Sequence, residues 1–363
     1  MVMVRALGMG GTERQAAEVA KSLDRGKFTP HVACFHEGFR AAELRQAGVP
    51  ILRLPVRSFA SPAAAAAAWS LGRYLRRERI RLVHTFDSPL NCFGVPVARA
   101  FRVPVVLSSQ RAHRALNAPP FRRLLRLTDR MVDGIVVNCE AVRRHLTEDE
   151  NVPAPLIHVC PNGIDTTVFH PTARARPPAL AEASLVIGVV CVLRPEKGLA
   201  LLLEAFAAVQ HMDEGLRLVI VGSGESLEDL QELSRELGIA AKCHFEPAVS
   251  DVTPWLRAID IFALPSLSEA LSNSLMEAMA SGCAVIASNT GGNPELVTDA
   301  ETGLLFKTGD SAALADRLRS LISTPNLRSA LSKAGAARIA ADFSIQSSVA
   351  RVERLYESFL RDQ

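Results

Sequence analysis

Short apolar runs, many of them β-branched, alternate with longer helical patterns along most of the 363-residue chain. This alternation is typical of parallel β-sheets wrapped by helices. In the first half we expect strands near residues 1–7, 31–35, 51–54, 82–86, 103–109, 134–138 and 157–161. The alternation of strand and helix patterns begins again in the second half, where we expect strands near residues 184–193, 216–222, 242–246, 259–265, 283–288 and 303–306.

The two series of strands predict two domains, since a chain of this length exceeds what one core usually supports. A Pro/Ala/Arg stretch without periodicity lies between them and is read as a linker over residues 171–183. We therefore expect Rossmann-like, doubly wound parallel sheets over residues 1–170 and 184–340, followed by a helical segment over 341–363. If the two α/β domains face one another, ligands bind in the cleft at the carboxyl ends of their strands.

The composition narrows the class of protein. Apolar residues make up 48% of the chain, yet no apolar run approaches the roughly 18 residues of a membrane span. No basic segment with a cleavage site opens the sequence, and the seven cysteines are scattered without a C-x-x-C pair. These features favour a cytoplasmic protein with reduced, packed cysteines.

The small net charge of +3 hides an asymmetry. Residues 1–170 hold 24 Lys and Arg against 14 Asp and Glu, whereas the remainder holds 17 against 24. The first half is therefore basic and the second acidic.

Two segments have residues suited to a phosphate group. Gly10 and Gly11 lie between the first strand and the first helix, where free amides favour an anion, although a simple tight turn is equally compatible. Arg194 and Lys197 stand three positions apart before the first helix of the second domain and could converge on one phosphate; a solvated helix start is the alternative. Gly222 follows the next strand and indicates either a turn or a wall of a nucleotide site.

The stretch "SEALSNSLMEAMASGCAVIAS" (268–288) places Glu269 in a loop and Glu277 inside a helix. Ser272 or Asn273 can cap that helix, and the first helical amides would then face a diphosphate. The two carboxylates could bind sugar and ribose hydroxyls at either side. One capping acid and one surface acid is the alternative interpretation.

Six motifs in order resemble the family 4 glycosyltransferases of the GT-B fold. They are "GMGGTER", "VCPNGIDTTVF", "LRPEKGL", "VGSGES", the E-x7-E stretch above and "GGNPELVTDAETGLLF". The resemblance covers nearly the whole chain. It implies a retaining transferase that moves a sugar from a nucleotide-sugar, most often a UDP-sugar, to a hydroxyl acceptor, with no cofactor.

The resemblance also implies roles for particular residues. Glu269 would bind the donor sugar, Glu277 the ribose, and Arg194 with Lys197 would neutralise the diphosphate in place of a metal ion, since the chain has no D-x-D pair. The final helical segment would cross back onto the first domain. The donor contacts would come from Gly10, Gly11, Gly222, Leu271, Ser272, Asn273, Ser274, Leu275 and Glu277.

One departure from the family pattern concerns the acceptor side. Many members place a histidine after the strand that here ends near residue 109, whereas this chain has Gln110 and Arg111, with His113 slightly later. These three are the acceptor-side candidates.

The arginine-rich segment 111–130 makes the first domain suited to anionic lipid head groups, a lipid diphosphate or an acidic glycan. We therefore expect a glycan or lipid-linked acceptor and peripheral contact with the inner face of an anionic membrane; a solvated basic face is the alternative. Nucleic acid is disfavoured because no binding module accompanies the arginines.

Two rival functions remain open. A sugar-nucleotide 2-epimerase has the same architecture but would lack the E-x7-E element followed by "EAMASG". A donor-binding subunit without catalysis is the second rival, because the expected histidine is missing.

Overall fold

The computed structural model describes residues 1–114, 118–172 and 176–361, so the predicted segments 111–130, 171–183 and 341–363 each lie partly outside the described residues. The chain forms two compact units. Met1–Gly163 and the chain from Ile345 onward make up the N-terminal unit, and Ile164–Ser344 make up the C-terminal unit.

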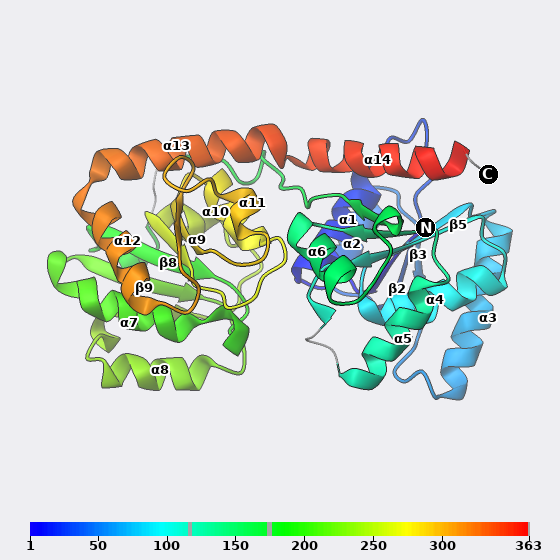
Figure 1. Ribbon diagram of the computed structural model, residues 1–363, viewed down its shortest axis with the longest axis horizontal. Helices are drawn as coiled ribbons and strands as arrows, with labels where there is room; N and C mark the ends of the chain where they lie inside the picture. The colour runs from blue at the N-terminus through cyan, green and yellow to red at the C-terminus, as the bar shows by residue number, and fades with distance from the viewer. Residues whose placement is uncertain (115–117, 173–175, 362–363) are drawn as a thin grey trace. The chain divides into compact units, whose positions relative to one another are not determined.

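The N-terminal unit has a seven-stranded parallel sheet in the order β3-β2-β1-β4-β5-β6-β7. Its strands are β1 (Val2–Ala6), β2 (Val32–His36), β3 (Ile51–Arg53), β4 (Leu82–Thr85), β5 (Val105–Gln110), β6 (Gly134–Val137) and β7 (Ile157–Val159). Its helices are α1 (Gly11–Ser22), α2 (Arg40–Gln46), α3 (Pro62–Arg77), α4 (Ser88–Ala100), α5 (Pro119–Asp129), α6 (Glu140–Glu148) and α14 (Ile345–Arg361). Helix α4 packs on β1, β4 and β5, with α3 and α5 beside it (Figure 1).

The C-terminal unit has a six-stranded parallel sheet in the order β10-β9-β8-β11-β12-β13. Its strands are β8 (Leu185–Val190), β9 (Leu216–Val221), β10 (Cys243–Glu246), β11 (Ile261–Leu264), β12 (Ala284–Ser288) and β13 (Leu304–Phe306). Its helices are α7 (Leu199–Val209), α8 (Leu227–Glu236), α9 (Thr253–Ala258), α10 (Asn273–Ala280), α11 (Asn293–Leu296), α12 (Ser311–Ser323) and α13 (Pro325–Asp342).

The predicted fold class is confirmed, and each expected strand forms in its expected segment. The physical reason is visible in β8, where all six residues are buried because helices cover both faces of a parallel sheet. Gly188 within β8 has a packing role. A Cβ there would lie 2.6 Å from side-chain atoms of Ile259 and Val219, so only glycine lets these neighbours close over the strand.

Helix α14 completes the core of the N-terminal unit, although it comes from the other end of the sequence. It lies beside α1, and its buried residues Val349, Val352 and Tyr356 belong to the same apolar cluster as β1 and β2 (Figure 1). Tyr356 also makes a buried polar contact, since its hydroxyl lies 2.7 Å from Nδ1 of His84 on β4. The chain end is therefore tied to the sheet by both apolar packing and a hydrogen bond.

His84 is held as a neutral imidazole. Its Nε2 is 2.8 Å from the hydroxyl of Ser109, and burial lowers the pKa of His84 well below its ordinary value, with the positive charge of Arg111 acting in the same direction. An unfolded chain takes up a proton on this histidine as the pH falls through about 6.5, whereas the folded chain does not. We therefore expect the N-terminal unit to lose stability as the pH falls below about 6.5.

Replacing Tyr356 with phenylalanine is expected to lower the free energy of unfolding of the N-terminal unit by about 1–3 kcal/mol, because a buried nitrogen of His84 loses its partner. Tyr74→Phe is the matched control. That hydroxyl lies 2.8 Å from Nδ1 of His31, in a less buried setting, and its loss is expected to cost less. Thermal and denaturant unfolding of both variants measure the difference, and equal losses would contradict this view of the α14 contact.

None of the helices in residues 1–114, 118–172 and 176–361 has both the length and the apolar character that crossing a bilayer requires. The seven cysteines, all of them described, are free thiols, and five are buried.

Candidate functional site

The predicted donor residues of the C-terminal unit gather where the strand order of its sheet reverses. Strands β8 and β11 are neighbours at the centre of the sheet, but the chain leaves them in opposite directions, toward β9 and toward β12. Lys197 lies in the turn after β8, and Glu269 lies in the loop after β11. Ligands of open α/β sheets bind at such a switch point, outside the carboxyl ends of the strands.

Lys197 and Glu269 form an ion pair across this switch point. Nζ of Lys197 donates to Oε1 of Glu269, and the hydroxyl of Ser266 donates to the same oxygen at 2.9 Å. The carboxylate side chain is only 9% exposed and the lysine side chain 20%. A partly buried cation and carboxylate are thus held side by side at the carboxyl edge of the sheet. The second carboxylate oxygen of Glu269, Oε2, is not paired with any residue in the described part of the chain.

The turn that carries Lys197 is braced against the loop that carries Glu269. A short 3-10 turn (Pro195–Lys197) precedes α7, and the amide of Leu267 donates to the carbonyl of Glu196 at 2.8 Å. Gly198 follows with φ +63°, and a Cβ there would lie 2.4 Å from the carbonyl oxygen of Pro265. Only glycine fits this left-handed position against another backbone, so the sequence fixes the approach of the two loops.

A third loop, after β12, supports Glu269 from its backbone side. Gly291 has φ +54°, and a Cβ there would lie 1.9 Å from the carbonyl oxygen of Glu269. The hydroxyl of Ser288 donates to the carbonyl of Ser266 at 2.6 Å, and the buried Asn293 side chain donates to the carbonyl of Ser288 at 3.1 Å. The carboxylate therefore stands on a packed platform built from three neighbouring strand ends.

Helix α10 starts directly after this platform. Ser272 is its N-cap, as one of the two predicted candidates, and its hydroxyl accepts from the amide of Leu275 at 3.3 Å. The amide of Leu275 is therefore engaged within the cap. Glu277 lies inside the helix as predicted and is 3% exposed, which excludes the alternative that it is a surface acid. The remaining predicted donor residues of the segment are Leu271, which is 5% exposed, and Asn273 and Ser274, which are half-buried.

Arg194 and Gly222 are placed differently from Lys197. The Arg194 side chain is 59% exposed, and its guanidinium lies 3.8 Å from the carboxylate of Glu196. A Cβ on Gly222 would lie 1.8 Å from the carbonyl oxygen of Cys191, so the close backbone approach at this glycine is to the loop after β8. Packing within the unit explains Gly222 without a ligand.

The glycine turn of the N-terminal unit connects β1 to α1. Gly10 is the N-cap residue of α1 with extended backbone angles, and Gly11 is the first helical residue. The helix is anchored by Gln15, whose side-chain amide donates to the carbonyl of Gly163 at 2.8 Å and accepts from the amide of Gly163 at 3.0 Å.

The acceptor-side candidates lie at the end of β5. Gln110 is buried, and its side-chain nitrogen donates to the carbonyl of Ala112 at 2.8 Å. Arg111 donates to the side-chain oxygen of Asn162 and lies over the ring of Phe86, with 4.6 Å between the guanidinium carbon and the ring centre. Burial lowers the pKa of Arg111 to about 10, so this guanidinium stays charged at neutral pH.

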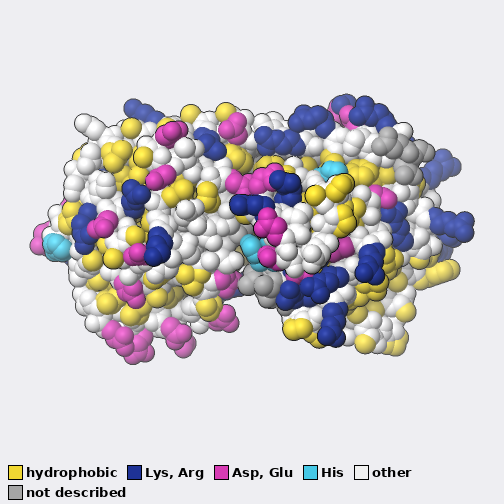
Figure 2. All heavy atoms as spheres, in the orientation of Figure 1, with side chains coloured by type: hydrophobic (Ala, Val, Ile, Leu, Met, Phe, Trp, Pro, Cys, Tyr) yellow, Lys and Arg dark blue, Asp and Glu magenta, His cyan; other side chains and the backbone are white. Residues whose placement is uncertain are grey.

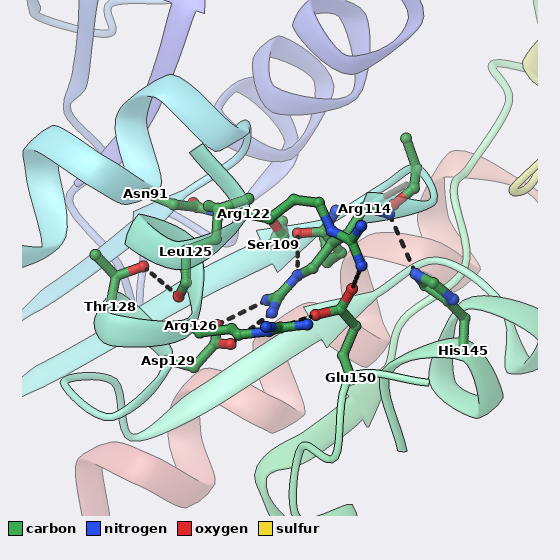
Figure 3. A network of polar contacts seen from close by, with 12 residues as sticks. Asn91, Ser109, Arg114, Arg122, Leu125, Arg126, Thr128, Asp129, His145 and Glu150 are labelled. Carbon is green, nitrogen blue, oxygen red and sulfur yellow. Dashed lines mark hydrogen bonds and ion pairs between the residues drawn. The ribbon is translucent and has the colours of Figure 1, made fainter. Parts of the chain in front are cut away.

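The loop after Arg111 is held by a buried ion pair that Figure 3 shows at its centre. Arg114, 1% exposed, donates to both carboxylate oxygens of Asp129, at 2.6 and 2.8 Å. Its backbone amide donates to Nε2 of His145 at 3.2 Å, and the ring of His113 lies 4.4 Å from that of His145. Burial lowers the pKa of His113, with the neighbouring His145 acting in the same direction.

Part of the arginine-rich segment is committed to internal pairing. Arg122 and Arg126 donate to the two oxygens of Glu150, at 2.7 and 2.9 Å, and the Glu150 side chain is fully buried (Figure 3). Arg123 on α5 and Arg130, directly after its last residue, are exposed. Figure 2 shows Lys and Arg spread over the N-terminal unit and Asp and Glu gathered at α8. The surface of α5 is thus less basic than the sequence suggests, and membrane contact remains a prediction.

Sequence reasoning missed the residues that support Glu269. Ser266 comes from the loop after β11, whereas Ser288 and Gly291 come from the end of β12 and the loop after it. Ser288 and Gly291 fall within motifs of the sequence, but nothing in these motifs indicated a contact with Glu269. Sequence reasoning also missed Asp129 as the partner of Arg114, and Glu150 as the partner of Arg122 and Arg126. These residues are too far apart in the sequence for a helical or strand pattern to connect them.

Two family profiles match consecutive parts of the chain. The family described as "Glycosyltransferase Family 4" matches residues 9–168, and the family described as "Glycosyl transferases group 1" matches residues 173–338. A D-inositol 3-phosphate glycosyltransferase of Segniliparus rotundus is 32% identical over 240 residues, covering 63% of this chain and 53% of that protein. The alignment thus spans about half the length of such curated relatives.

A second curated relative comes from Mycobacterium tuberculosis. The GDP-mannose-dependent alpha-(1-6)-phosphatidylinositol monomannoside mannosyltransferase of this organism is 32% identical over 259 residues, 66% of either chain. Among solved structures, Anabaena Alr3699/HepE in complex with UDP and glucose has a TM-score of 0.85 at 20% identity, covering 98% of this chain and 99% of that one. Sucrose-phosphate synthase of Thermosynechococcus elongatus has a TM-score of 0.84 at 18% identity, with full coverage of both. These likenesses show the fold.

Proposed function

Because the chain belongs to the group 1, family 4 glycosyltransferases of the GT-B fold, we propose that it transfers a sugar from a nucleotide-sugar to a hydroxyl acceptor with retention of configuration. The observation that carries this proposal is the Lys197–Glu269 pair at the switch point of the C-terminal sheet. The pair supports the proposal because a lysine can stabilise the charge of a leaving diphosphate and a carboxylate can accept hydrogen bonds from sugar hydroxyls.

The chemistry follows from where charge develops. The bond between the anomeric carbon and the diphosphate oxygen breaks, a bond to the acceptor oxygen forms, and the acceptor proton passes to the departing diphosphate. Lys197, with Arg194 and the first amides of α10, stabilises the negative diphosphate. Glu269 holds the sugar through hydroxyl hydrogen bonds, and the buried Glu277 binds the ribose.

The donor is proposed to be a UDP-sugar, as the family resemblance implies, with GDP-mannose as the competing candidate. A UDP-sugar is supported by a similar structure that holds UDP and glucose, and GDP-mannose by a curated relative that is named as GDP-mannose-dependent. For the acceptor we propose a glycan or lipid-linked glycan precursor.

A donor screen without acceptor tests the function. Incubation with a panel of UDP-sugars and GDP-mannose is expected to release the free nucleotide slowly from one donor, with the sugar unchanged in configuration at C2. A product epimerised at C2 would instead identify a 2-epimerase. Binding of a donor with no nucleotide release, even when candidate acceptors are added, would identify a donor-binding subunit and overturn the proposal.

A further inference from the structure

A hollow of about 460 Å³ opens at the carboxyl edge of the N-terminal sheet. It is formed where β1, β2 and β3 end, and these three strands are neighbours in the sheet. Its volume lies within the range of small-molecule sites. None of the acceptor-side candidates at the end of β5 lines it, so it is a separate feature of this unit.

Three basic side chains from three different strand ends line the hollow. Arg5 comes from β1, His36 from the end of β2, and Arg57 from the segment after β3. Neither Arg5 nor Arg57 makes an ion pair through its side chain with any residue in the described part of the chain. Two guanidinium groups that form no ion pair are therefore gathered at one opening, and only the Arg5 guanidinium has the charge of the Asp87 carboxylate nearby. The positive charge that remains favours an anionic ligand.

The nearby carboxylate of Asp87 is engaged by the backbone and does not fill this role. Its Oδ2 accepts from the backbone amide of Arg5, and its Oδ1 accepts from the amide of Leu90 at 3.0 Å, where it caps α4. Burial raises the pKa of Asp87 to about 6, against the opposing effect of these hydrogen bonds and of the positive charge of Arg5. The carboxylate is therefore held by two backbone amides at the start of α4, and neither arginine side chain forms an ion pair with it.

An aromatic wall stands beside the cations. Phe35, Phe59 and Phe93 form a three-ring cluster in which Phe59 stacks on Phe93, with ring centres 6.2 Å apart and an angle of 16° between the planes. Phe35 and Phe93 are buried, whereas Phe59 is 42% exposed and lines the hollow. The outer ring therefore offers a flat apolar surface that is already held in place, suited to stacking on a sugar ring or an apolar group.

We propose that this hollow binds the acceptor through a phosphate group, with Arg5, His36 and Arg57 around the phosphate and Phe59 against the group that bears it. The inference rests on the proposed function and narrows its acceptor to phosphate-bearing compounds. No covalent step takes place in the hollow. Its role is to bind and orient the acceptor.

The test titrates the full chain with inorganic phosphate, phenyl phosphate and phenol by calorimetry, in the presence of saturating UDP to occupy the donor site. Phenyl phosphate is expected to bind more tightly than either of its two parts. Arg57→Gln is expected to weaken both phosphate probes about tenfold. Phe59→Ala is expected to weaken phenyl phosphate and phenol and to leave inorganic phosphate unchanged. Arg53→Gln, a matched exposed arginine on β3 outside the hollow, is expected to leave all three affinities unchanged.

Glycerol 3-phosphate and dihexanoyl phosphatidic acid distinguish a soluble acceptor from a lipid one, because they share the phosphate and differ in the acyl chains. Tighter binding of one identifies the source, and loss of both in Arg57→Gln supports the site. Absence of phosphate binding by the wild-type chain, or equal effects of Arg57→Gln and Arg53→Gln, would overturn the inference. Failure of the proposed function has a separate readout, since it would appear as a wild-type chain that releases no nucleotide from any donor.

Discussion

Replacing Lys197 with alanine is expected to lower the rate of sugar transfer by about 100- to 1000-fold, the range seen when one preorganised donor to a developing negative charge is removed. The loss should fall on kcat as well as on donor affinity, because the diphosphate gains charge as the bond to the sugar breaks. The fold should survive, since the hydroxyl of Ser266 still donates to Glu269. Steady-state kinetics together with denaturant unfolding measure both quantities.

Lys242→Ala is the matched control for this prediction. Lys242 lies just before β10, and its Nζ donates to the backbone carbonyl of Gln210 at 2.9 Å, away from the switch point. Its removal is expected to leave the transfer rate near that of the wild type. An unchanged rate in Lys197→Ala would show that the diphosphate lies elsewhere.

Asp129→Ala is expected to give the largest loss of stability in the N-terminal unit, about 3–5 kcal/mol, because it leaves the Arg114 guanidinium buried without its carboxylate. The loop that carries Arg111 and His113 is held by the same pair, so it should lose its position in whatever folded protein remains. Chemical unfolding followed by far-UV circular dichroism measures the change.

Two further variants make this result interpretable. The double variant Arg114→Met with Asp129→Leu removes both charges and is expected to recover much of the lost stability. Asp316→Ala removes the partner of Arg319 in an exposed pair on α12 and is expected to change stability little. If Asp129→Ala and Asp316→Ala lowered the free energy of unfolding by the same small amount, Arg114 would have another partner for its charge.

Much of the fold could be predicted from the sequence because parallel strands covered on both faces are continuous apolar runs. Strand β8 and strand β5, each with six buried residues, are examples. Both ends of α10 could be predicted equally well, since Ser272 caps its start and Gly282 with φ +83° follows its last turn. Such signals are local, so they survive without knowledge of the tertiary structure.

The pairing of charged side chains could not be predicted in the same way. The three-residue spacing of Arg194 and Lys197 predicts that both side chains can reach one phosphate, and this stays a prediction. The spacing did not indicate that Lys197 pairs with Glu269, 72 positions away. Arg114 and Arg122 likewise find carboxylates that no local repeat connects to them. Ion pairs of this kind depend on which strand ends become neighbours, and the order of strands in a sheet is a property of the whole fold.

The structure of the chain with a bound donor tests the central claim most directly. With UDP-glucose or GDP-mannose bound, the account predicts Lys197 within hydrogen-bond distance of the diphosphate, a sugar hydroxyl on the carboxylate of Glu269, and the ribose on Glu277. A nucleotide bound away from the ends of β8 and β11, with none of these three side chains in contact, would contradict it.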